Sequence, residues 1–248
     1  MAMVMGGIMF VLVFGGALGG MYLRKVLPEH HLTAESRDLV KLGVGLIATM
    51  SALILGLLVA SAKGSYDAQR NQILQLSGEV VLLDRVLAHY GPDAKEARDV
   101  LKLTVANAID RLWPRVQSPR TQFESMAGEI LLDKIQQLSP ASDAQRSLQS
   151  RAVDLTIGLG RIRWLLVAQS QRSIPVPFLV AVVFWFCIIF ASFGLSAPRN
   201  PMVMITLLIC ALSVSLAIVM ILELDQPFQG IVQIPSEPLR NALAHLGQ

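Results

Sequence analysis

Four long stretches of this 248-residue chain contain no charged residue, and they constrain its fold more than any other feature. They are residues 1–23, 42–62, 173–198 and 200–222. All 21 Lys and Arg and all 18 Asp and Glu residues lie elsewhere. Because a helix rises about 1.5 Å per residue, about 20 apolar helical residues cross the hydrocarbon core of a bilayer. The pattern predicts four membrane-spanning helices and excludes a simple soluble enzyme.

The first stretch could instead be a cleaved signal sequence, because Ala17-Leu18-Gly19 has small residues at the two outer positions of a cleavage site. However, no Lys or Arg precedes Arg24, and the apolar run exceeds the usual signal core of about 7–15 residues. We therefore expect a retained first span. Its small residues suit close packing of membrane helices, and they include Gly6, Gly7, Gly15, Gly16, Gly19 and Gly20.

The second stretch carries small side chains on one face. Gly45, Thr49, Ala52, Gly56 and Ala60 are three or four residues apart, which places them along one stripe of a helix. These five residues are called the small-residue stripe below. Two interpretations remain open. The stripe permits tight packing against another helix, or it lines a pore or an oligomer interface.

The polar region at residues 64–172 is predicted to be helical. No proline occurs between Leu32 and Gly91, so the second span can continue into this region as one helix. Gly91 followed by Pro92 predicts the end of that helix and the start of another, because glycine favours helix C-termini and proline favours first turns.

Three further helices are expected in the polar region. They cover residues 94–112, about 121–138, and 141–171, and Ser139 with Pro140 is the predicted N-cap and first-turn proline of the last helix. Neither a strand pattern nor a repeat is evident in the sequence. The region is therefore predicted to be a helical bundle that extends from the membrane helices.

The whole chain is thus predicted to be all-α, a four-span integral membrane protein with a helical extramembrane bundle between the second and third spans. Residues 1–63 hold spans at about 3–23 and 41–62, and residues 173–223 hold a hairpin of spans at about 176–196 and 202–222. Residues 224–248 form a C-terminal tail.

Composition and motifs argue against an enzyme and against nucleic-acid binding. Residues 64–171 hold 13 basic and 12 acidic side chains, which is a balanced surface and not a basic patch. The sequence lacks the common nucleophile, phosphate-loop and metal-ligand motifs, so no cofactor and no metal is expected. His30 and His31 beside Glu29 supply too few ligands for a metal site. Because the spans hold no charge, a proton-coupled pump is disfavoured.

Two acidic residues, Glu223 and Asp225, follow the fourth span. They could form ion pairs with Arg161, Arg163 or Arg172 on the same side of the membrane, or they could bind an ion. The sequence leaves both alternatives open.

Four segments carry the pattern of a known family: residues 27–63, 81–91, 192–195 and 223–230. Over nearly its whole length, the chain resembles a family of bacterial membrane proteins with a bestrophin-like domain. Bestrophins are pentameric anion channels with four spans per subunit and a cytosolic helical part between the second and third spans. Their pore is lined largely by the second span. The resemblance therefore implies that the small-residue stripe is the candidate pore lining.

The resemblance also implies a location and an orientation, namely the bacterial inner membrane with cytoplasmic termini and a cytoplasmic helical region. Basic residues near the spans number six on that side and five on the other, so they do not decide the orientation. Bestrophins hold calcium in an acidic cluster after their last span. Here only Glu223 and Asp225 lie near that position, so the resemblance does not extend to calcium gating.

Two hypotheses of function follow. The first is a homo-oligomer in the lipid bilayer, a pentamer by resemblance, that passively conducts small anions past the second span. The second is a non-conducting membrane scaffold or sensor whose helical bundle binds a partner protein through the surface of residues 92–138.

Overall fold

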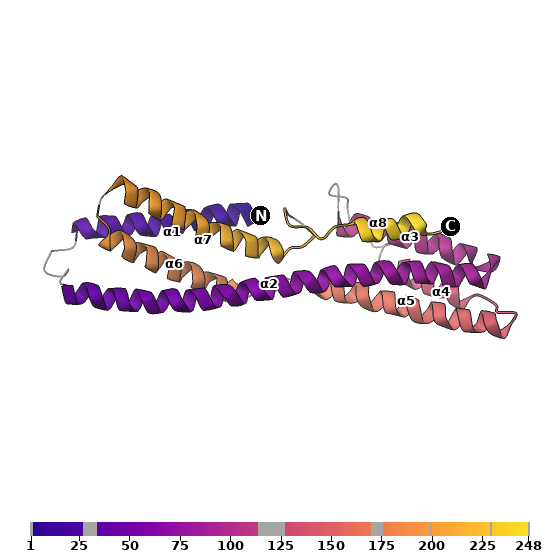
Figure 1. Ribbon diagram of the computed structural model, residues 1–248. Coiled ribbons are helices and arrows are strands. Elements are labelled where there is room, and N and C mark those ends of the chain that lie inside the picture. Colours follow the sequence, from indigo (N-terminus) through magenta and orange to yellow (C-terminus); the bar gives the residue numbers. More distant parts are fainter. Residues whose placement is uncertain are drawn as a thin grey trace. The chain divides into compact units, whose positions relative to one another are not determined.

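The computed structural model describes residues 2–26, 34–113, 127–169, 176–198, 200–228 and 230–247, without the side chains of residues 2, 34–37 and 127. All elements in these residues are helices (Figure 1). Four of the helices are long and apolar enough to cross a membrane. The predicted all-α, four-span fold is therefore confirmed.

The chain divides into two compact units, each described here by itself. The span unit comprises Met1–Ser65, Arg172–Gln226 and Gly230–Val232, and the bundle unit comprises Tyr66–Gln171, Pro227–Gln229 and Gln233–Gln248. Helix α2 (Ala34–Tyr90) is continuous and contributes its first part to the span unit and its second part to the bundle unit. The prediction that the second span continues as one helix is confirmed.

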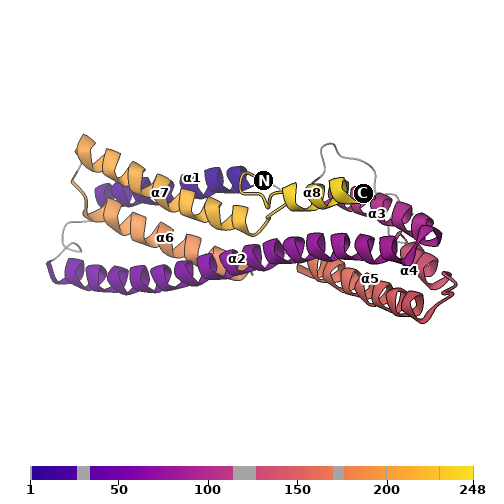
Figure 2. The same ribbon diagram turned by 45° about the vertical axis from the view of Figure 1, so that its right-hand side comes forward.

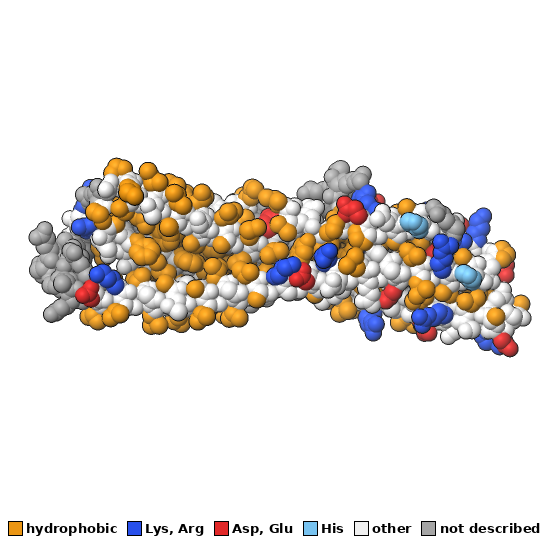
Figure 3. All heavy atoms as spheres, in the orientation of Figure 1, with side chains coloured by type: hydrophobic (Ala, Val, Ile, Leu, Met, Phe, Trp, Pro, Cys, Tyr) orange, Lys and Arg blue, Asp and Glu red, His pale blue; other side chains and the backbone are white. Residues whose placement is uncertain are grey.

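In the span unit, α1 (Ala2–Val26) lies beside α6 (Val176–Ser196) and α7 (Pro201–Leu224), as both views show (Figures 1 and 2). Buried apolar side chains from these helices fill the spaces between them, and they include Val13, Ala17, Leu179, Val182, Ile189, Phe190, Leu207, Ala211 and Ile218. Apolar side chains also gather on the outer surface of these helices (Figure 3). Such a surface is expected where lipid replaces water.

Glycines allow the backbones of α1 and α6 to approach each other closely. A Cβ atom on Gly20 would overlap the carbonyl oxygen of Ala191, and one on Gly194 would overlap the carbonyl oxygen of Ala17. A Cβ atom on Gly19, by contrast, would meet nothing within 4 Å. The prediction that glycines of the first span serve helix packing is therefore confirmed at Gly20 but not at its neighbour.

The ends of the span helices are held by polar contacts. The side-chain oxygen of Asn200 accepts the backbone N–H of Met202 at 3.4 Å, and Pro201 occupies the first turn of α7. At the end of α1, the guanidinium of Arg24 donates to the carbonyl oxygen of Ala197. The Arg24 contact fixes the end of α1 beside the connection from α6 to α7.

In the bundle unit, the second part of α2 packs with α3 (Lys95–Leu112), α4 (Ala127–Gln136), α5 (Asp143–Gln169) and α8 (Glu237–His245). Their shared core includes Leu83, Leu87, Leu101, Val105, Ile135, Leu155, Ile162 and Leu239. The sequence prediction treated the C-terminal residues only as a tail. They form α8 because Leu239 and Ala242, three residues apart, bury one face of a short helix.

The end of α2 follows the predicted pattern. Gly91 has a φ of +120°, a backbone conformation that glycine adopts without a steric cost, and Pro92 begins a short 3₁₀ helix (Pro92–Ala94). The side-chain amide of Gln145 donates to the carbonyl oxygen of Tyr90 at 3.0 Å, which satisfies an unpaired carbonyl group at this end of the helix.

The start of α5 differs from the prediction. Ser139 and Pro140 lie before the helix and do not cap it. The N-cap is Ser142, whose hydroxyl accepts the N–H of Gln145 at 3.2 Å, while the side chain of Gln145 accepts the N–H of Ala141 at 2.8 Å. This pair of bonds satisfies two free N–H groups, which a proline at position 140 alone does not do.

A buried ion pair joins three segments of the bundle unit. The guanidinium of Arg98 on α3 donates to both carboxylate oxygens of Asp84 on α2, at 2.8 and 2.9 Å. The backbone N–H of Gly247 donates to the same carboxylate at 3.3 Å. The side chain of Asp84 is only 3% exposed. Burial would raise the pKa of Asp84, but the Arg98 and Gly247 donors outweigh burial and hold its pKa below the ordinary value.

The lowered pKa of Asp84 predicts a loss of stability in acid. The stabilisation is fully present above the ordinary aspartate pKa of about 3.9 and is lost as the pH falls through the lower folded-state pKa. We expect the difference in unfolding free energy between the wild type and Asp84→Asn to shrink over this acid range. Chemical unfolding in detergent at a series of pH values measures it. A difference that stays constant down to the lowest pH would contradict the prediction.

Candidate functional site

The first part of α2 has one face that packs within the span unit. Its buried or partly buried side chains contact residues of α6 and α7, and they include Val44, Ile47, Ala48, Leu55, Leu58 and Ala62. Ser51 lies on this face as well, where it is 1% exposed and donates to the carbonyl oxygen of Ile47 at 2.8 Å. This face anchors α2 to the other span helices.

The small-residue stripe lies on a different face of α2. Gly45, Thr49, Ala52, Gly56 and Ala60 are all exposed in the chain. A Cβ atom on Gly45 or on Gly56 would meet nothing within 4 Å, and the hydroxyl of Thr49 donates to the carbonyl oxygen of Gly45 at 2.8 Å. Within the described part of the chain, the stripe is therefore not a tight helix contact.

Helix α2 is also the least covered of the four candidate spans. Only 11% of its apolar window is buried within the chain, against 28% for each of the other three. Besides the stripe, large apolar side chains such as Leu46, Leu53 and Leu57 are exposed on it. Most of the surface of this span is thus available to lipid or to another subunit.

The two acidic residues at the C-terminal end of α7 are buried. Glu223 is 8% exposed, and its carboxylate accepts the N–H of Ile231 at 2.6 Å. Gly230, between them, has a φ of +107°, and a Cβ atom there would overlap that carboxylate. Asp225 is buried as well and ends α7, with its N–H bonded to the carbonyl oxygen of Ile221 at 3.1 Å. Glu223 thus holds the turn that follows the fourth span.

Replacing Gly230 with alanine is expected to destabilise this turn, because alanine would combine a strained positive φ with an overlap of the Glu223 carboxylate. The matched control is Gly91→Ala, where φ is +120° but the space is open. We expect a loss of about 1–2 kcal/mol from backbone strain in the control and a larger loss in Gly230→Ala. Thermal unfolding in detergent compares the two variants, and equal losses would show that the carboxylate contact contributes nothing.

Within the described residues, no group of three or more His, Cys, Asp or Glu side chains could hold a metal ion. Glu29, His30 and His31, the only histidine-rich segment of the sequence, lie outside the residues that the structure describes, as does Arg172. Cys187 and Cys210 are free thiols on α6 and α7. The acidic turn at Glu223 and Asp225 therefore does not include a third such ligand among the described residues.

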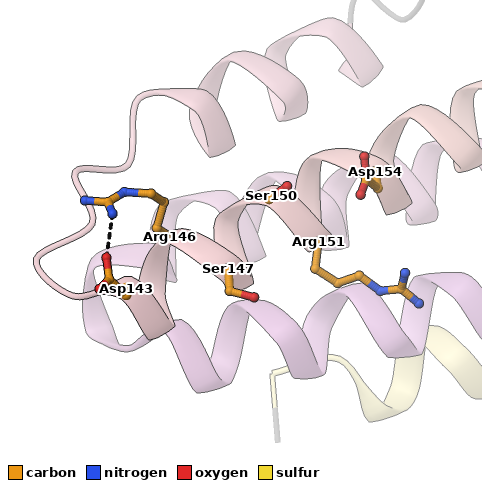
Figure 4. Close-up of a pocket in the computed structure, with 6 residues that line it drawn as sticks. All are labelled: Asp143, Arg146, Ser147, Ser150, Arg151 and Asp154. Atoms are coloured by element: carbon orange, nitrogen blue, oxygen red, sulfur yellow. Dashed lines mark hydrogen bonds and ion pairs between the residues drawn. The ribbon is translucent and has the colours of Figure 1, made fainter.

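A shallow polar depression runs along α5, and Figure 4 shows the side chains that line it. Arg146 turns toward Asp143, with which it forms an ion pair, while Arg151 extends away from both. All of the lining residues come from one helix. The side chains do not converge on a common point, so the depression does not form a binding site.

These features define a class: a helical membrane protein with four candidate spans, whose second span continues into an extramembrane bundle. The chain belongs to the bestrophin-like family, since the model of the Bestrophin-like domain matches residues 11–239.

Solved structures agree with this assignment at the level of the fold. Two substituted forms of a bacterial bestrophin homologue from Klebsiella pneumoniae are similar to the chain, both at 15% sequence identity. The first has a TM-score of 0.66 and covers 98% of this chain and 99% of its own, and the second has a TM-score of 0.64 and covers 100% and 99%. No curated protein matches the sequence.

Proposed function

We propose that this protein is a homo-oligomeric channel that passively conducts small anions across the bacterial inner membrane. One observation carries the proposal: the small-residue stripe of α2 is exposed along its whole length, while a different face of the same helix packs against α6 and α7. In a ring of subunits, the stripe would face the central axis. Small side chains leave room there for an ion, and the Thr49 hydroxyl and helix dipoles supply polar groups.

Membership of the bestrophin-like family supports the same proposal, because bestrophins are pentameric anion channels lined by the second span. We propose that the termini and the helical bundle lie in the cytoplasm, and the family relationship supports this orientation. The four candidate spans are in keeping with it, because two of them precede the bundle and two follow it.

The test is a pair of glycine substitutions two residues apart on α2. Gly45 belongs to the stripe, whereas Gly43 lies about 160° away around the helix, and a Cβ atom at either position meets open space. We expect Gly45→Leu to reduce chloride flux from proteoliposomes strongly, because four added carbons would narrow the path. Gly43→Leu should leave it near the wild-type rate.

Size-exclusion chromatography of each variant checks that its oligomeric state is retained. Equal chloride fluxes in two correctly assembled variants would contradict the proposal that the stripe lines the conduction path. A wild-type protein that conducts nothing would instead favour the scaffold hypothesis.

A further inference from the structure

The face of α2 that carries the stripe ends in a basic residue. Lys63 follows Ala60 by three residues and Gly56 by seven, which places all three on the same helical face. Lys63 is exposed and belongs to the span unit, as the stripe does. It is also the first charged side chain after the apolar stretch of this helix.

On the face of α2 that carries the stripe, the two ends of the apolar stretch differ in charge. At the start, Lys41 and Asp38 form an ion pair with an N–O distance of 3.0 Å, so their charges cancel. At the other end, Lys63 is followed on the same face by Asp67 and then by Arg70, seven residues after Lys63. Two basic residues and one acidic residue give this end of the apolar stretch a net positive charge. The residue closest to the stripe is the lysine.

On the basis of the proposed function, we propose that Lys63 determines the preference of the conduction path for anions over cations. In a closed oligomer, each subunit would contribute one Lys63 ammonium group to a ring at the end of the stripe. Rings of Lys or Arg side chains raise the local concentration of anions and repel cations. The stripe itself holds no charge, so the sign of the permeant ion is set at this ring.

A lysine at the end of a membrane helix also has a common structural role, in which its ammonium group reaches the lipid headgroups. The two roles make different predictions. Loss of a headgroup contact would change the stability or the yield of the protein, but it would leave the ratio of chloride to potassium permeability unchanged.

The experiment measures this ratio from the reversal potential of the full-length protein in planar bilayers under a KCl gradient. We expect Lys63→Glu to lower the ratio at least about tenfold, and Lys63→Arg to preserve it. Lys102→Glu, an exposed lysine on α3 with the same change of charge, is the matched control and should leave the ratio unchanged.

A second design avoids comparing proteins that fold differently. Lys63→Cys is prepared with Cys187 and Cys210 replaced by alanine, and the assembled channel is labelled with a positively or a negatively charged thiol reagent. The positive label should restore the anion preference and the negative label should reverse it. An unchanged ratio in a conducting protein would overturn the role of Lys63 but leave the channel intact. Absence of any wild-type current would overturn both proposals.

Discussion

Replacing Arg98 with alanine is expected to lower the unfolding free energy of the bundle unit by about 3–5 kcal/mol. The reason is the burial of its partner. The Asp84 carboxylate is 3% exposed and receives two hydrogen bonds from Arg98, so removal of the guanidinium takes away both bonds and leaves the buried carboxylate with the longer bond from the Gly247 N–H. A buried carboxylate that loses its hydrogen-bonded counter-charge is strongly destabilising.

The control is Lys134→Ala. Lys134 also forms an ion pair between two helices of the bundle, at 2.8 Å from Glu96, but the Glu96 side chain is 71% exposed. An exposed pair contributes less than about 1 kcal/mol, because water screens both charges. Denaturant unfolding of both variants in detergent measures the contrast. Similar losses in the two variants would mean that burial does not set the strength of the Asp84 pair.

Replacing Gly20 with alanine is expected to destabilise the span unit by about 1–3 kcal/mol, because the added methyl group would overlap the carbonyl group of Ala191. The neighbour is backbone and not a flexible side chain, so α1 and α6 must separate to relieve the overlap. Gly194→Ala should have a similar effect through the carbonyl group of Ala17.

Gly19→Ala provides the comparison one residue away. Its Cβ atom would meet open space, and alanine favours helix over glycine by about 1 kcal/mol, so this variant should be as stable as the wild type or more stable. Unfolding of the purified proteins in detergent distinguishes the two glycines. Equal stability of Gly19→Ala and Gly20→Ala would contradict the close approach of α1 and α6.

Much of the fold could be predicted because single residues decide helix ends. The absence of proline between Leu32 and Gly91 predicted that α2 is continuous, and Gly91 with Pro92 marked its end. The start of α5 was predicted wrongly, because Ser139 with Pro140 fits the pattern of an N-cap followed by a first-turn proline. Ser142 and Gln145 fit a second pattern, the capping box, and in the structure this pair makes the bonds at the start of the helix.

The candidate site was less accessible from the sequence, because spacing shows which residues share a face but not what covers it. Periodicity grouped Gly45 with Gly56, and the structure adds that this face is open within the chain. The arginines considered as partners of Glu223 gave no hint that its carboxylate binds the backbone of Ile231. Asp84 and Arg98 are 14 residues apart on different helices, and no local pattern predicts that they meet.

The proposal that α2 lines a central path is tested most directly by a single-particle image of the purified full-length protein in detergent. We expect a closed ring of about five subunits, with the α2 helices nearest the axis and the small-residue stripe facing it. A monomer, or a dimer with no path along its axis, would contradict the proposal.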